Sequence, residues 1–217
     1  MIIIGDVGGQ YSALLALLAK MPIGEPIILL GDLNDRGPES RQVIEFAMSN
    51  NNVRTLNSNH QDGLVDHWLS IFEPDYERRY SPEQFFTNGG QATLESYGAE
   101  KGMNPVESAS LIPAYHIQWL RSLPGLIETE ELLLSHAPIL AELPIEEVKK
   151  IPHEAEHSLL WARNAPSPRS KFQIFGHNSH WGLMWLDDFA VCLDASKQNV
   201  LTGLHWPSKR IYQQYFG

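Results

Sequence analysis

Short apolar runs alternate with helix-length segments along this chain, and each run ends in a small group of polar residues. The first three runs cover Ile2 to Gly5, Ile27 to Leu30 and Val53 to Leu56. Segments of helical length, from about Ser12 to Met21 and from Pro38 to Asn50, separate them. This alternation predicts a layered α/β architecture in which the apolar runs are buried strands.

The second half of the chain continues the pattern. Leu132 to Leu134 and Phe172 to Phe175 are predicted strands, and a helix from Ile112 to Leu123 precedes them. Phe189 to Leu193 and Val200 to Trp206 are predicted to be consecutive strands of one closing antiparallel sheet. The stretch from about Phe72 to Met103 lacks a long clean period, and we expect a helical insertion at about 72–123. The length of 217 residues and the 43% hydrophobic content suit a single domain, 1–217.

The polar residues at five strand ends form the most informative group. In open α/β sheets the ligand crevice lies beyond the carboxyl ends of the strands, so residues at those ends are expected to meet in space. Their oxygen and nitrogen atoms suit divalent transition metals such as Mn, Fe or Zn. Asp32 lies in the richest loop and is the candidate carboxylate shared between two ions. The five residues are Asp6, Asp32, Asn59, His136 and His177.

Charge and composition narrow the range of partners. The formal net charge is −10 and no basic cluster is visible, so neither nucleic acid nor an anionic membrane is an expected partner. Without a basic groove, the six tryptophans are better explained as core or substrate-rim residues. The single Cys192 suits a reducing compartment, and Met1 leads straight into a strand without a secretory signal pattern, so a cytoplasmic location is expected.

Five short motifs, in order along nearly the whole chain, resemble those of the calcineurin-like metallophosphoesterases. The similarity is to the phosphoprotein phosphatase branch, especially the small bacterial and lambda-type phage serine/threonine phosphatases. It implies a four-layer α/β/β/α sandwich of two mixed sheets with a small helical insertion. The motifs are Gly5-Asp6-Val7-Gly8-Gly9, Gly31-Asp32-Leu33-Asn34-Asp35-Arg36-Gly37, Ser58-Asn59-His60-Gln61, Ser135-His136-Ala137 and Gly176-His177.

This resemblance implies two divalent metal ions, with Mn the most expected and Fe or Zn as alternatives. Asp6 and Asp32 would bind the first ion. Asp32, Asn59, His136 and His177 would bind the second.

The same resemblance assigns the catalytic and phosphate-binding residues. His60 would be the proton donor and Asp35 its carboxylate partner, since a charged imidazole can protonate a leaving alkoxide. Arg36 would hold phosphate together with Asn59, and Arg163 resembles a second phosphate-binding arginine. A guanidinium fork matches two phosphate oxygens.

Gly8 is the main departure from the family pattern, because the family has a metal-binding histidine there. The change is expected to weaken the first metal site or lower turnover at least about 10-fold, as for disturbed metal sites generally. Two smaller departures are Ser58 for glycine, which would alter the turn, and Gln61 for glutamate. His180 is expected to pack in its loop, and Asn88-Gly89-Gly90 to form a turn in the insertion or to shape the entrance to the site.

The expected function is a metal-dependent phosphomonoesterase that acts on phosphoproteins or small aryl phosphates. One alternative is a phosphate-binding protein that lost catalysis with the histidine at position 8. Another is a dinucleoside polyphosphate hydrolase or nucleotide phosphodiesterase. The Asp35-Arg36 doublet argues against the symmetrical dinucleoside tetraphosphate hydrolases, whose loop lacks that aspartate.

Overall fold

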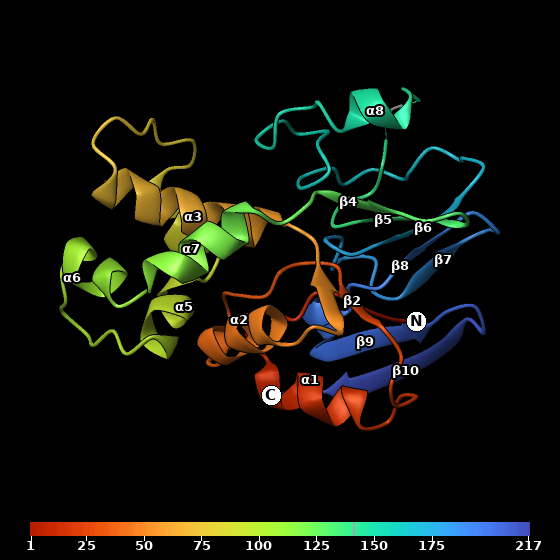
Figure 1. Cartoon of the computed structure of the whole chain (residues 1–217), viewed down its shortest axis with the longest axis horizontal. Helices are drawn as coiled ribbons and strands as arrows, with labels where there is room; N and C mark the ends of the chain where they lie inside the picture. Colours follow the sequence, from red (N-terminus) through yellow and green to blue (C-terminus); the bar gives the residue numbers. More distant parts are fainter. Residues whose placement is uncertain (141) are drawn as a thin grey trace.

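The computed structural model describes residues 1–140 and 142–217 and contains two mixed five-stranded sheets (Figure 1). The first sheet has the order β10-β9-β1-β2-β3 and consists of β1 (Ile2–Ile4), β2 (Ile27–Leu29), β3 (Val53–Thr55), β9 (Val200–His205) and β10 (Arg210–Tyr215). The second sheet has the order β4-β5-β6-β8-β7 and consists of β4 (Leu126–Glu128), β5 (Leu132–Ser135), β6 (Phe172–Phe175), β7 (Met184–Leu186) and β8 (Ala190–Cys192). Strands β1, β2 and β3 run parallel, as do β5, β6 and β8.

The two sheets pack face to face through a shared apolar core. Ile3 of β1 points into this core and meets side chains of the second sheet such as Leu134 and Ile174. Its neighbours Ile2 and Ile4 point the other way, toward α1 (Tyr11–Leu18) and α2 (Ser40–Ser49). A strand buried on both faces needs a continuous apolar run, which explains the three successive isoleucines.

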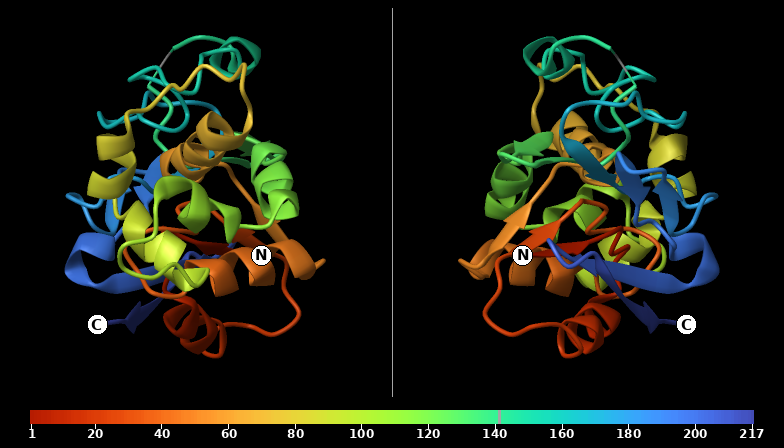
Figure 2. Two further views of the ribbon diagram at one scale, coloured as in Figure 1. Left: turned by 90° about the vertical axis from the view of Figure 1, so that its left-hand side faces the viewer. Right: turned by 90° about the vertical axis from the view of Figure 1, so that its right-hand side faces the viewer.

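The outer face of the second sheet is covered more thinly than that of the first. Leu133 packs there against Ile139 and against Val148 of the short helix α8 (Ile145–Val148). Helices α1 and α8 lie at opposite ends of the molecule in both side views, with the sheets between them (Figure 2). The expected four-layer α/β/β/α sandwich is therefore confirmed, with a fourth layer made largely of loops.

Helices gather beside the sandwich, on the left of Figure 1. Four of them fall in the range 72–123, where the sequence predicts a helical insertion: α4 (Pro82–Thr87), α5 (Gly90–Ser96), α6 (Pro105–Ser110) and α7 (Ala114–Arg121). Helices α4, α6 and α7 pack on α3 (Asn59–Phe72), a helix that the sequence analysis did not anticipate, and α5 packs on α2 and α4. None of the helices among the described residues is long and apolar enough to cross a bilayer. The division of the chain into a single domain stays a prediction.

Helix α3 begins with a capping arrangement that the sequence does contain. Ser58 has an extended backbone, and its Oγ accepts a hydrogen bond from the backbone N–H of Gln61 at 3.3 Å. A serine followed three residues later by glutamine is a known helix-start signature. Ser58, one of the two lesser departures from the family motif, therefore caps the helix whose first turn carries Asn59 and His60, and Gln61, the other departure, supplies the backbone N–H that is capped.

One prediction about pairing is wrong. The runs Phe189 to Leu193 and Val200 to Trp206 are not consecutive strands of one antiparallel sheet, because β8 lies in the second sheet, parallel to β6, and β9 lies in the first. The segment between them, including the short 3-10 helix η1 (Ser196–Gln198), crosses from one sheet to the other. Strand β9 pairs with β1 on one side and with β10 on the other, and the polar sequence of β10 gave no strong strand signal.

His67 on α3 is a buried histidine with an unusual environment. Its ring stacks on Phe85 at a centroid distance of 4.1 Å, and neither ring nitrogen has a hydrogen-bond partner within the described structure. Burial, together with the charge of Arg78, lowers the pKa of His67 to about 4. The folded protein thus holds His67 neutral near pH 7.

This environment predicts an acid-sensitive contribution to stability. The unfolded chain takes up a proton on His67 near its usual pKa of about 6.5. In the folded state the pKa is about 4, so the free energy of unfolding should fall as pH drops from 6.5 to 4. The fall should reach at most about 3 kcal/mol from this group. In urea titrations at pH 7.5 and 5, His67→Phe should lose less stability than the wild type; an equal loss would contradict this prediction.

Candidate active site

The loops after five strands meet at one edge of the sandwich. Asp6 follows β1, Asp32 follows β2 and Asn59 follows β3 in the first sheet, while His136 and His177 follow β5 and β6 in the second. One ligand atom from each of Asp6, Asp32 and His136 lies within 4.8 Å of the other two. All five side chains are at least nine-tenths buried. The structure thus brings the predicted metal ligands together, and we call these five residues the ligand cluster.

His136 shows why this cluster suits a cation. Its Nδ1–H donates to the carbonyl oxygen of Leu30 at 3.0 Å, which leaves Nε2 with a lone pair. That lone pair faces Asn59 Oδ1 at 2.8 Å, His177 Nδ1 at 3.1 Å and Asp32 Oδ1 at 3.3 Å. Several electron-pair donors therefore converge on one point, which is the arrangement that a cation requires.

Two further atoms point to the same conclusion. Asp32 Oδ1 and His177 Nε2 are buried without a hydrogen-bond partner in the described part of the chain. Buried polar atoms are rarely left in that state. A divalent cation of the N/O-ligand class would satisfy the converging donors, so the residues fit the metals that the sequence predicts.

The protonation states of these groups also suit metal binding. Burial, followed by the charges of His136 and Arg163, lowers the pKa of His177 to about 2. Burial also lowers the pKa of His136. Burial alone would raise the pKa of Asp32, but the positive charge of His60 and other neighbours holds it below its usual range. Neutral imidazoles and an ionised carboxylate are the forms that bind metal ions.

Asp194 is a buried carboxylate at this site that is not among the site residues predicted from the sequence. It is 1% exposed and lies within hydrogen-bonding reach of Asp6. Burial, followed by the charges of Asp194 and Asp32, raises the pKa of Asp6. Asp194 directly follows the apolar run that ends at Leu193, the same strand-end pattern that identified Asp6 and Asp32. That signal was present and was missed.

His60 lies beside the ligand cluster with both ring nitrogens engaged. Nδ1 contacts Asp35 Oδ2 at 2.6 Å, and Nε2 lies 3.6 Å from Asp32 Oδ2 and 3.1 Å from Arg36 Nη2. Burial would lower the pKa of His60, but the charges of Asp32 and Asp35 raise it. A positively charged imidazole is therefore stabilised at this position, as a proton donor requires.

Asp35 is itself fixed by a residue of the helical insertion at 72–123, which we call the helical lobe. Thr93 on α5 donates its hydroxyl hydrogen to Asp35 Oδ1 at 2.6 Å, and its Oγ1 accepts from the backbone N–H of Asp35 at 2.8 Å. Asn34 Nδ2 also donates to Asp35 Oδ1, at 2.8 Å. Thr93 lies 58 residues from Asp35, so no local sequence pattern could have linked it to the site.

The loop after β2 holds several of its residues in left-handed backbone conformations. The φ angles are +46° for Asp32, +71° for Asp35 and +66° for Arg36, and His177, in the loop after β6, has a φ of +64°. Such conformations are costly for residues other than glycine and are often found at functional sites. The turn Asn88-Gly89-Gly90 supports this loop, because the carbonyl oxygen of Gly89 accepts a hydrogen bond from the backbone N–H of Arg36 at 3.3 Å.

The two predicted phosphate-binding arginines lie in different places. Arg36 is next to His60, whereas Arg163 Nη1 donates to the carbonyl oxygen of His177 at 3.2 Å. Both side chains are exposed, and neither forms an ion pair with a carboxylate among residues 1–140 and 142–217. Two guanidinium groups thus border the ligand cluster from different sides with their charge available to an anion.

Gly8 faces a cavity of about 520 Å³ that also exposes Asp6, Asp32 and His60. A Cβ atom placed at Gly8 would come no closer than 3.9 Å to its nearest neighbour, the carbonyl oxygen of Asp35. There is room for a side chain, although the φ angle of +55° is one that L residues rarely adopt. His180, expected to pack in its loop, lines the same cavity and lies 2.9 Å from Lys197 Nζ.

Buried oxygen and nitrogen donors converge on one point, with a histidine–carboxylate pair beside them, and this arrangement fits metal-dependent hydrolysis. The family model for calcineurin-like phosphoesterases matches residues 1–203. The chain therefore belongs to the calcineurin-like phosphoesterase family.

Curated relatives include enzymes named symmetrical bis(5′-nucleosyl)-tetraphosphatase. The proteins from Salmonella paratyphi C (strain RKS4594) and Klebsiella pneumoniae are each 29% identical over 160 residues, which is 71% of this chain and 48% of the relative. The chain thus spans about half the length of the curated relatives it matches. These matches weigh against the prediction, based on Asp35 and Arg36, that the chain differs from the symmetrical dinucleoside tetraphosphate hydrolases.

Solved structures of similar fold include a proposed diadenosine tetraphosphatase, with a TM-score of 0.68, 18% identity and coverage of 100% of this chain and 93% of that one. A protein serine/threonine phosphatase from Saccharomyces cerevisiae has a TM-score of 0.61 and 14% identity, covering 100% of this chain and 79% of that one. At these identities the likeness shows the fold alone.

The geometry at Gly8 predicts the effect of restoring the side chain. In Gly8→His, the imidazole would enter the cavity beside Asp6 and Asp32 and add a nitrogen ligand. Affinity for the more weakly held Mn²⁺ ion should rise at least about 10-fold, measured by calorimetric titration. Stability without metal should fall by about 1–2 kcal/mol because of the left-handed backbone.

Gly8→Ala is the matched control, since it introduces the same backbone cost without a ligand atom. It should lose stability to a similar extent and bind Mn²⁺ as the wild type does. Equal Mn²⁺ affinity for Gly8→His and Gly8→Ala would show that position 8 does not contribute to a metal site.

Proposed function

We propose that this chain is a metal-dependent hydrolase of dinucleoside polyphosphates, with phosphate monoesters as the second substrate class. The observation that supports phosphate-ester chemistry most strongly is the convergence of the ligand cluster beside the His60–Asp35 pair. The names of the curated relatives support the dinucleotide class. In this respect they favour the alternative of the sequence analysis over a serine/threonine phosphatase.

The shape of the site fits a substrate that extends in two directions from the reacting phosphate. A cavity of about 520 Å³ borders the cluster through Asp32 and His60. A larger one, of about 830 Å³, borders it through Trp161 and Arg163, both next to His177. A dinucleoside polyphosphate has a nucleoside at each end of a phosphate chain, so it can use both cavities.

The residues then take the following roles. Asp6, Asp32, Asn59, His136 and His177 hold divalent ions, for which we propose Mn. When bound, such ions activate water and stabilise charge on phosphate oxygens. Arg36 and Arg163 bind and orient the phosphate chain as charged donors. His60 transfers a proton from its imidazole to the oxygen that leaves phosphorus, and Asp35 keeps the imidazole oriented and charged.

A binding protein without turnover is the other candidate, and the observation that favours it is Gly8. With one ligand fewer at the first ion, Arg36 and Arg163 could still hold phosphate.

We also propose that the protein is located in the cytoplasm. Its single cysteine, Cys192, is a free thiol, and free thiols are typical of proteins in reducing compartments.

A substrate panel tests the proposal. With Mn²⁺ present, the chain should hydrolyse diadenosine tetraphosphate with a higher kcat/KM than a phosphoserine peptide or p-nitrophenyl phosphate. Chelation of the metal should abolish all three activities. A higher kcat/KM for the peptide would instead support the serine/threonine phosphatase function, and phosphate affinity without any turnover would support the binding protein.

Replacing His60 gives a second, sharper prediction. A phosphate leaving group is a much weaker base than a serine alkoxide and has less need of a proton in the transition state. His60→Asn should therefore lower kcat on the phosphoserine peptide by about 10²–10⁴-fold, and on diadenosine tetraphosphate by clearly less.

His205→Asn is the control for this series, because His205 lies in the β9–β10 hairpin and contacts Ser208 rather than the cluster. It should leave both rates unchanged. If His60→Asn lowers both rates equally, His60 does not act as the acid for the leaving group.

A further inference from the structure

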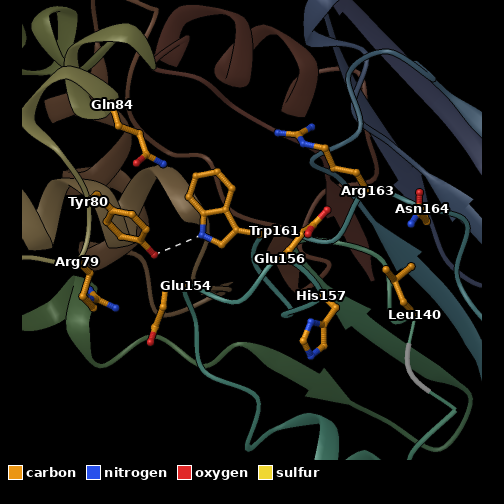
Figure 3. A pocket seen from close by; sticks show the side chains of 10 residues that line it. All are labelled: Arg79, Tyr80, Gln84, Leu140, Glu154, Glu156, His157, Trp161, Arg163 and Asn164. Atoms are coloured by element: carbon orange, nitrogen blue, oxygen red, sulfur yellow. Dashed lines mark hydrogen bonds between the residues drawn. The ribbon is translucent and has the colours of Figure 1, made fainter.

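The larger cavity, of about 830 Å³, opens next to the ligand cluster and is drawn in Figure 3. Its wall includes Arg163, whose Nη1 contacts the carbonyl oxygen of His177, and Trp161, whose ring centroid lies 6.1 Å from that of His177. The volume lies within the range of about 300–1,000 Å³ that is typical of small-molecule sites. A ligand held at the cluster therefore has room to continue into this cavity.

Trp161 is held in place by a chain of buried polar contacts. Its Nε1–H donates to Tyr80 Oη at 3.3 Å, and Tyr80 Oη donates to Asp62 Oδ2 at 2.7 Å. Asp62 is in turn paired with Arg79 Nη1 at 2.9 Å. Tyr80 and Asp62 are buried, whereas Trp161 is half-buried and lines the cavity. The indole is thus ordered before a ligand arrives, which lowers the entropic cost of stacking against it.

The polar side chains around Trp161 match the hydrogen-bonding groups of a nucleotide. Gln84 and Arg79 lie on one side of the indole and Arg163 on the other, while Glu154 and Glu156 lie nearby (Figure 3). An amide can donate to and accept from the edge of a base, and carboxylates can accept from ribose hydroxyls. A guanidinium suits the adjoining phosphate.

We propose that this cavity binds the nucleoside end of a nucleotide, with the base stacked on Trp161 and the first phosphates directed toward Arg163. Base stacking on an aromatic ring tolerates any base, so the cavity defines a class of ligand and not one nucleobase. This inference rests on the proposed function and names the residues that recognise one end of the substrate. The smaller cavity, beside Gly8, remains for the other end.

Binding of adenosine 5′-monophosphate to the Mn²⁺-loaded protein, measured by isothermal titration calorimetry, tests this subsite. Trp161→Ala should raise the Kd at least about 10-fold, as expected for loss of base stacking. Trp161→Phe keeps an aromatic face and should stay within about threefold of the wild type. Ribose 5-phosphate has no base, so its Kd should not respond to either change.

Trp185→Ala is the matched control, since Trp185 is an exposed tryptophan on β7 that does not line the cavity. It should bind both probes like the wild type. The inference is overturned if Trp161→Ala binds adenosine 5′-monophosphate normally. It is also overturned if that variant weakens both probes equally, because Trp161 would then act through its neighbour His177.

Turnover of diadenosine tetraphosphate separates this inference from the proposed function. Trp161→Ala should raise KM for this substrate while leaving kcat/KM for p-nitrophenyl phosphate within about threefold, because the small substrate does not reach the indole. Absence of diadenosine tetraphosphate turnover, with nucleotide binding that still depends on Trp161, would sink the proposed function and support the subsite. Turnover of diadenosine tetraphosphate, with nucleotide binding that does not depend on Trp161, would support the proposed function and overturn the subsite.

Discussion

The fold depends, at its functional edge, on one hydrogen bond: that from His136 Nδ1–H to the carbonyl oxygen of Leu30. It commits the only proton of a neutral imidazole to the backbone and turns the other nitrogen toward Asn59, Asp32 and His177. Because Leu30 directly follows β2 of the first sheet and His136 directly follows β5 of the second, this bond also links the two sheets. The same hydrogen bond therefore orients a predicted metal ligand and connects the two sheets.

Contacts from the rest of the molecule offset the unfavourable free energy of the buried charges and strained backbone at this site. Buried carboxylates and left-handed backbone at Asp32, Asp35 and Arg36 are each unfavourable on their own. The inter-sheet core fixes the strand ends, and the helical lobe supplies Thr93 to Asp35 and Gly89 to Arg36. The lobe also sets Trp161 through Tyr80. It thus connects the His60–Asp35 pair to the cavity proposed to bind the nucleoside.

Much of this was predictable from sequence because strand ends carry two signals at once, an apolar run and the polar residue that follows it. Asp6, Asp32 and His177 were found in this way, and Asp194 would have been found by the same rule. The pairing of β8 and β9 was not predictable, because two apolar runs close in sequence look alike whether they form a hairpin or cross between sheets. Thr93 and Trp161 act through contacts across 58 and 81 residues, which no local pattern encodes.

The most direct test of the central claim is anomalous diffraction at the manganese edge from crystals grown with Mn²⁺. The account predicts two peaks within bonding distance of Asp32. One should lie among Asn59, His136 and His177, and the other beside Asp6, with lower occupancy because position 8 is glycine. Strong peaks elsewhere in the molecule, with none touching Asp32, would contradict it.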